Sequence, residues 1–227
     1  MIILHIETST NVCSVAVSNQ SECIFSVSNT EGMNHAALLS AFIQEAMQHI
    51  KALNLKLDAV AVSSGPGSYT GLRIGVSTAK GLCYGLEIPL ISVSTLEVLT
   101  VSAMHTIADK ELQLLFCPMI DARRMEVYSG FYDKNLQSFR SISADIIDET
   151  SYAEILENNT VYFFGNGAEK CKQSLTHENV RFLDNINPSA ENMIPLAVKR
   201  YNTSQFEDVA YFEPFYLKEF HTTSPKK

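Results

Sequence analysis

The stretch Ser64-Gly65-Pro66-Gly67-Ser68-Tyr69-Thr70-Gly71 decides the fold, because it joins a strand-like run to a helix-like run. The preceding residues 57–63 alternate Ala and Val and predict a buried strand, whereas residues 72–86 carry apolar side chains at helical spacing. Glycine at such a turn permits a close backbone approach, and the helix N-terminus that follows can bind an anion. A tight turn that only packs the strand on the helix explains the same residues, so both interpretations stay open.

Two phosphate-binding motifs are excluded by this stretch. No Gly-Lys-Ser/Thr follows it, so it is not a Walker A loop. Gly65-x-Gly67 continues to Thr70 where the dinucleotide fingerprint requires glycine. A second polar turn, Glu7-Thr8-Ser9-Thr10, ends the first predicted strand, where an actin-like ATPase domain would face phosphates and magnesium. A hairpin turn bonded to its own backbone is the alternative.

The residues on either side of the turn predict a mixed sheet. The strands expected before it lie at 1–7, about 12–17 and 24–27, followed by a helix at 35–50. After it come a strand at 89–93 and a third helix, opened by the capping box Ser94-x-x-Glu97. Strand–helix alternation implies right-handed crossovers and parallel pairing, and the opening hairpin adds antiparallel strands.

The second half of the chain repeats this order of strands followed by helices. A polar segment at 106–113 marks the boundary, so we expect lobes at 1–106 and 107–227, with the carboxy-terminal segment free to return to the first lobe. The elements expected there are strands at 114–121, 126–132, 138–148 and 161–165, a short helix opened by Ser151-x-x-Glu154, a helix at 188–201 and a frayed tail at 221–227. The repetition hints at a duplicated architecture.

Composition excludes several classes of protein. The chain has 227 residues, 46% of them hydrophobic and 19% charged, which indicates a globular fold that needs no disulfide or metal. Its net charge of −8 makes it a poor autonomous binder of nucleic acid. The longest apolar run, 114–120, is too short to cross a membrane. No Lys or Arg precedes Lys51, and the five cysteines form no Cys-x-x-Cys pair, so we expect no signal peptide and a reducing, cytoplasmic setting.

Candidate catalytic and metal-binding groups are few. The sequence contains neither His-x-x-x-His nor His-Glu-x-x-His, so we predict no metal site and no catalytic residue. Arg123-Arg124 beside Asp121 fits either a phosphate contact or an exposed turn between two strands.

The helix after the glycine-rich turn has a second face of small residues, formed by Gly71, Gly75, Thr78, Gly81 and Gly85. Each glycine costs helix stability, ~1 kcal/mol relative to Ala, so several together need a reason. Close approach of another protein's helix is one, and packing within the chain is the other. Arg73 places a cation in the first turn, against the helix dipole, which hints at a partner carboxylate that Arg73→Ala would test.

The run from Ser64 to Gly75 resembles the TsaB (formerly YeaZ) proteins of bacteria, the partners of the TsaD enzyme in making threonylcarbamoyladenosine in tRNA. Supporting matches are Ile6-Glu7-Thr8-Ser9, Gly81, Pro89, Asp121-Ala122-Arg123-Arg124, Gly165-Asn166-Gly167-Ala168 and, more weakly, Pro214–Leu217. The resemblance implies an α/β protein of the actin-like ATPase (ribonuclease H-like) fold, with two related lobes of mixed sheets flanked by helices.

The resemblance also implies a role and a set of residues. The chain would be a non-catalytic dimerisation or scaffold subunit that binds and activates a TsaD-type subunit, with a TsaE-type ATPase docking on the pair, self-association as a homodimer, and tRNA contacted only through the complex. The residues implied to face the partner lie on the helices and in the glycine-rich loop. They are His35, Leu38, Leu39, Phe42, Tyr69, Thr70, Gly71, Arg73, Ile74, Gly75, Thr78 and Leu82. Vestigial phosphate-facing residues would be Glu7, Thr8, Ser9, Gly65 and Gly67. No cofactor is implied for the isolated chain, and ATP or ADP at the complex interface is left open.

One departure separates the chain from the catalytic relative. TsaD proteins carry a His-x-x-x-His pair just after the strand that follows the glycine-rich segment, whereas residues 94–99 here read Ser-Thr-Leu-Glu-Val-Leu. The alternatives to an accessory subunit are a stand-alone small-molecule kinase or ATPase of the same fold, using Glu7, Ser9 and the glycine loop, and a metallopeptidase, which the missing histidine pair disfavours.

Overall fold

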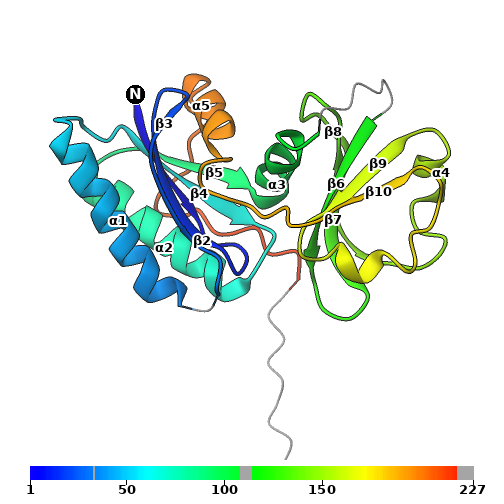
Figure 1. Cartoon of the computed structure of the whole chain (residues 1–227). Coiled ribbons are helices and arrows are strands. Elements are labelled where there is room, and N and C mark those ends of the chain that lie inside the picture. The colour runs from blue at the N-terminus through cyan, green and yellow to red at the C-terminus, as the bar shows by residue number, and fades with distance from the viewer. Residues whose placement is uncertain (33, 108–113, 219–227) are drawn as a thin grey trace, which may run out of the picture.

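The computed structural model describes residues 1–32, 34–107 and 114–218, which fold into two lobes that lie side by side (Figure 1). Each lobe is built around one five-stranded sheet. None of the helices within those three ranges is long and apolar enough to cross a membrane.

The first sheet has the strand order β3-β2-β1-β4-β5. Its strands are β1 (Ile2–Glu7), β2 (Cys13–Asn19), β3 (Glu22–Asn29), β4 (Ala59–Gly65) and β5 (Leu90–Ser94). β1, β2 and β3 pair antiparallel, whereas β4 and β5 run parallel to β1. The mixed sheet predicted from the opening hairpin is confirmed.

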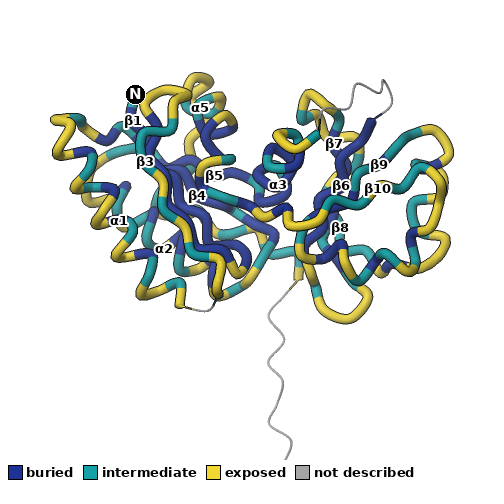
Figure 2. The backbone as a smooth tube through the Cα atoms, viewed as in Figure 1, coloured by how far each residue is buried: buried dark blue, intermediate teal, exposed yellow. Residues whose placement is uncertain are grey.

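Helices cover both faces of the first sheet. α1 (His35–Ala52) and α2 (Tyr69–Leu86) lie on one face, and α3 (Thr95–Met104) and α5 (Ile194–Asn202) lie on the other (Figure 1). Side chains of β1 alternate between the two cores, since Leu4 packs with α1 and α2 while Ile3 packs with α3 and α5. α3 also packs on the second sheet and is buried along its length, so it separates the two sheets as an internal layer (Figure 2).

The second sheet has the order β10-β9-β6-β7-β8. Its elements are β6 (Leu114–Asp121), β7 (Glu126–Tyr132), β8 (Ser138–Ile146), α4 (Ala153–Leu156), β9 (Thr160–Phe164), η1 (Glu169–Cys171) and β10 (Val180–Leu183). Taken from β8, three antiparallel strands are followed by two that run parallel to β6. β6 therefore takes the place of β1, and the predicted fold class of two related lobes is confirmed.

Some predicted boundaries are wrong, and tertiary contacts explain them. β4 continues to Gly65 and α2 begins at Tyr69, so the irregular turn is only 66–68. The helix expected from Pro188 begins at Ile194, because the residues before it lie against the first sheet, where Ala190 N donates to Ser14 Oγ (2.9 Å). β10 was not predicted; it is a short strand of intermediate exposure at the edge of the sheet.

Both predicted capping boxes are wrong. Ser94 makes no side-chain cap on α3, and Glu97 Oε2 accepts from Arg200 on α5 (2.6 Å). Ser151 Oγ donates to Asp148 (3.0 Å), and α4 begins two residues later without a side-chain cap. The pattern was present in both places, but Glu97 and Ser151 bind other partners and Ser94 Oγ makes no hydrogen bond within the described residues.

Two further expectations fall largely on residues that the structure does not describe. The predicted lobe boundary at 106–113 lies mostly within 108–113, and the predicted frayed tail at 221–227 lies beyond residue 218. Both stay predictions.

The residues after α5, here called the C-terminal segment (203–218), run along the first lobe and then reach the second (Figure 1). Glu207 N donates to Leu90 O (2.9 Å), and Lys80 Nζ donates to Phe212 O (2.8 Å). Phe215 N donates to Ser64 O (2.7 Å), at the end of β4. The segment thereby arrives beside the glycine-rich turn.

His5 gives the first lobe a specific pH dependence. Its ring is fully buried on β1, Nε2 shares a hydrogen bond with Ser18 Oγ (2.9 Å), and Nδ1 has no partner within the described ranges. Burial lowers the pKa of His5 from 6.5 to about 3. Because the folded state requires the neutral ring, the stability that it contributes is present above about pH 6.5 and is lost as the pH falls toward 3.

We therefore expect His5→Gln to reduce the loss of unfolding free energy between about pH 7 and pH 5 by ~2 kcal/mol. Urea titrations of both proteins at the two pH values measure it. The buried Glu7 carboxyl has a raised pKa and acts in the opposite direction, but it is common to both proteins and cancels in the comparison. Equal losses in the two proteins would contradict this assignment to His5.

Candidate functional site

The glycine-rich turn and the β1–β2 turn lie directly against each other at the end of β1. Ser68 N donates to Ser9 O (2.7 Å), and Thr8 Oγ1 donates to Gly71 O (2.8 Å). A Cβ on Gly67 would overlap Ser9 O, and a Cβ on Gly71 would overlap Thr8 O. These glycines are required because two backbones meet, which is the packing interpretation of the turn.

Two backbone N–H groups at the start of α2 already have hydrogen-bond partners within the chain. The Ser68 side chain caps the helix by accepting from Gly71 N (3.3 Å), while Ser68 N is bonded to the β1–β2 turn. Two N–H groups that a phosphate would need are therefore already engaged within the chain.

Glu7 is buried below the turn and binds its neighbours. Its Oε1 accepts from Ser9 N (2.7 Å) and Ser9 Oγ (2.6 Å), and its Oε2 accepts from Ser63 Oγ. Burial raises the pKa of Glu7, and the hydrogen bonds from Ser63 and Ser9 offset part of that rise. Oε1 thus holds the β1–β2 turn, and Oε2 joins β1 to β4.

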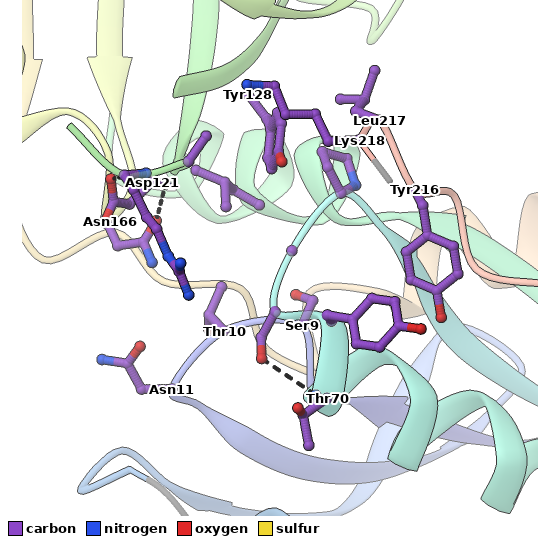
Figure 3. Close-up of a pocket in the computed structure, with 18 of the residues that line it drawn as sticks. Ser9, Thr10, Asn11, Thr70, Asp121, Tyr128, Asn166, Tyr216, Leu217 and Lys218 are labelled. Carbon is purple, nitrogen blue, oxygen red and sulfur yellow. Dashed lines mark hydrogen bonds between the residues drawn. The ribbon is translucent and has the colours of Figure 1, made fainter. Parts of the chain in front are cut away.

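A cleft of about 1670 Å³ lies between the two lobes (Figure 3). Its first wall comes from the β1–β2 turn and the start of α2, including Ser9, Thr10 and Thr70. Its second wall comes from β6, β7 and the loop after β9, including Tyr128 and Asn166. Of the predicted phosphate-facing residues, Ser9 and Gly67 line this cleft, whereas Glu7, Thr8 and Gly65 lie outside its lining.

The β6–β7 turn brings two arginines to the second wall. Arg123 and Arg124 are exposed and line the cleft, and both have left-handed backbones with φ of 72° and 49°. Two successive non-glycine residues in this region cost ~1–2 kcal/mol each. Asp121 anchors the turn, since its Oδ1 accepts from Arg123 N (3.0 Å) and its N donates to Asn166 Oδ1 (3.0 Å).

The C-terminal segment forms a third side of the cleft (Figure 3). The ring of Tyr216 lies 4.9 Å from that of Tyr69, and Arg73 lies 5.1 Å above the Tyr69 ring. Lys218 pairs with Glu126 of β7, so the segment connects the lobes. The Tyr69 contact gives Arg73 a partner within the chain, which explains its position without a second protein.

The predicted partner-facing residues divide into two groups. Those at least partly exposed are His35, Leu38, Phe42, Tyr69, Thr70, Arg73, Ile74, Thr78 and Leu82. The remaining three are unavailable to a partner, which corrects the prediction: Leu39 is 1% exposed within the core, and Gly71 and Gly75 are buried against Thr8.

The outward face of α1 and α2 includes a row of small side chains on each helix. Its exposed members are Ala37 and Ala41 on α1 and Ser77, Gly81 and Gly85 on α2, each set at intervals of four residues. A Cβ on Gly81 or Gly85 would meet nothing within 4 Å. The small residues of α2 therefore serve two purposes: Gly71 and Gly75 admit the β1–β2 turn, and Gly81 and Gly85 leave an open surface.

Several cleft residues were not in the predicted site. Asn166 and Arg123 come from motifs that sequence reasoning noticed but did not place, and Tyr216 comes from a segment with no periodic pattern. Ala37 and Ala41 of α1 were also absent from the predicted partner-facing residues. Only the spacing of Ala37 and Ala41 could have indicated them.

Two lobes with the same strand order, set on either side of a cleft, define a two-lobed α/β protein of the actin-like class. A family model described as "TsaD: tRNA N6-adenosine threonylcarbamoyltransferase" matches residues 29–221. YeaZ from Pseudomonas aeruginosa has a similar structure, with a TM-score of 0.80 at 23% identity over 95% of this chain and 99% of that one.

The chain belongs to the TsaB family. The Bacillus subtilis protein named "tRNA threonylcarbamoyladenosine biosynthesis protein TsaB" is 30% identical over 178 residues, covering 77% of this chain and 75% of that one. The Escherichia coli protein of the same name is 29% identical over 229 residues, covering 96% and 95%. A threonylcarbamoyltransferase of Geotalea daltonii matches over only 63 residues, 18% of its own length.

Proposed function

We propose that this chain is an accessory, non-catalytic subunit of the machinery that forms threonylcarbamoyladenosine in tRNA, acting in the cytoplasm as the partner of a TsaD-type catalytic subunit. The observation that carries the proposal is the open, small-residue face of α1 and α2, joined to membership of the TsaB family. A helix pair can approach such a face closely and bury it.

Two buried or half-buried carboxylates of the first lobe support an accessory role. The stretch that holds paired histidines in the catalytic relative forms the start of α3 here, and Glu97 within it pairs with Arg200. Both oxygens of Glu7 are bonded to serines. These polar groups hold the chain together and are not aimed at a substrate.

A stand-alone kinase or ATPase is the less favoured function. It would need Glu7, Ser9 and the glycine loop to receive magnesium and phosphates, but these groups bind one another in the folded chain. Nucleotide bound at the interface with the catalytic subunit, a TsaE-type ATPase docked on the pair, and self-association through the same helices are further parts of our proposal.

Assembly with the catalytic subunit tests this function. We expect light scattering after size exclusion to detect a one-to-one complex of this chain with a TsaD-type subunit from the same organism. We also expect modification of unmodified tRNA, supplied with threonylcarbamoyl adenylate, to depend on both proteins. If the mixture elutes unchanged even with ATP and the TsaE-type protein present, the proposal is wrong.

A further inference from the structure

The Arg123–Arg124 turn has no role in the proposed contact between subunits, yet both arginines adopt an unfavourable left-handed backbone conformation. Neither guanidinium forms a hydrogen bond or an ion pair with any of the described residues. Most other arginines of the chain have one, as Arg140 has with Asp145 and Arg200 with Glu97. Strained backbone that presents two unpaired cations to a cleft points to an anionic ligand.

The charge balance of the cleft favours such a ligand. Three carboxylates line it, Glu31, Asp121 and Glu126. Asp121 is paired with Lys170, and Glu126 is paired with Lys218. The two arginines therefore face only one unpaired carboxylate, in a chain whose net charge is −8.

The size and lining of the cleft select the kind of anion. Its volume of about 1670 Å³ exceeds the ~300–1,000 Å³ usual for small-molecule pockets. Tyr69, Tyr128 and Tyr216 also line it, and aromatic rings beside a cationic wall are the arrangement that binds single-stranded nucleic acid by stacking and phosphate contact. Of the backbone N–H groups that could hold a mononucleotide phosphate, Ser68 N donates to Ser9 O in the β1–β2 turn and Gly71 N donates to Ser68 Oγ.

We propose that the cleft between the lobes holds an unpaired segment of the RNA substrate, with Arg123 and Arg124 on its phosphates and Tyr216 against a base. This inference rests on the proposed function, because an acidic chain with two free arginines binds RNA weakly alone and needs the catalytic subunit to hold the rest of the molecule. It assigns this subunit a direct contact with RNA.

The test measures binding of labelled, unmodified tRNA to the assembled complex by fluorescence anisotropy over a range of salt concentrations. We expect Arg123→Gln/Arg124→Gln to weaken binding roughly tenfold at about 0.1 M salt and to lower the slope of log affinity against log salt by about 1.4, for two single-strand phosphate contacts. We expect Tyr216→Leu to weaken binding at least about fivefold with the slope unchanged, since stacking releases no counterions.

The matched control removes two exposed cations elsewhere. Lys134→Gln/Lys199→Gln makes the same change in net charge, in the β7–β8 turn and on α5, and should leave affinity and slope unchanged. Assembly of each variant with the catalytic subunit is verified first. A wild-type pair that fails to assemble contradicts the proposed function itself.

Three results would overturn the RNA contact while leaving the proposed function intact. The first is an arginine variant with wild-type tRNA affinity and slope. The second is an equal loss in the lysine control, which would show a net-charge effect only. The third is an arginine variant whose affinity for ATP falls while its affinity for tRNA does not, which would make the cleft a mononucleotide site.

Discussion

Gly71→Ala is expected to lower the free energy of unfolding by ~3 kcal/mol or more, although it adds only one methyl group. The added Cβ would overlap Thr8 O, a backbone atom of the β1–β2 turn that cannot rotate away. Thr8 is fully buried, and its hydroxyl donates to Gly71 O, so any shift also breaks a buried hydrogen bond. Chemical denaturation of the isolated chain measures the loss.

The same helix supplies the matched control. Gly81 has nothing within 4 Å of its Cβ position and lies on the outward face of α2. Gly81→Ala should stabilise the chain by up to ~1 kcal/mol, because alanine is the better helix former. If the two variants lost equal stability, the division of the α2 glycines into an internal and an external set would be wrong.

Gly81→Arg is expected to weaken the complex with the TsaD-type subunit by at least ~100-fold while the chain stays folded. The long side chain would stand on the small-residue face that we propose to meet the partner helices, so binding would have to bury or displace a guanidinium. Size exclusion with light scattering at micromolar concentration, followed by titration, measures the loss. The same variant should prevent self-association.

Two controls make this result specific. Gly81→Ala adds only a methyl group and should bind the partner within a few-fold of the unaltered chain. Asn135→Arg places the same side chain in the exposed β7–β8 turn of the second lobe and should bind normally. Undiminished binding by Gly81→Arg would move the partner surface away from the outward face of α2.

Elements with strong local patterns were predictable from the sequence. β6 and β7 have the predicted bounds, because an apolar run and a run rich in Val, Tyr and Phe flank a short turn that contains two arginines. α1 begins at the predicted residue and continues two residues past the predicted end at Ile50. Elements set by distant contacts were not predictable: α5 starts late because residues 188–193 lie against the first sheet, and β10 is only a short strand at the sheet edge.

The candidate site was likewise only partly predictable from the sequence. Sequence reasoning found the glycine-rich turn but left its purpose open between packing and phosphate binding. The structure supplies a packing reason for the glycines through Ser9 O and Thr8 O, which come from a turn about sixty residues earlier in the chain. The cleft needs three segments from both lobes, so no local pattern could reveal that Tyr128 and Tyr216 line the same space.

The path of the chain end has a consequence for biosynthesis. Met193, Leu196 and Ala197 complete the core on the face of the first sheet opposite α1 and α2. Phe215 N donates to Ser64 O at the end of β4. A ribosome releases these residues only after the strands of the second lobe have been made. The first lobe to emerge is therefore the last to be completed, because α3 alone covers this face of its sheet until α5 has been made. Chaperone occupancy on nascent chains should accordingly persist until α5 has emerged from the ribosome.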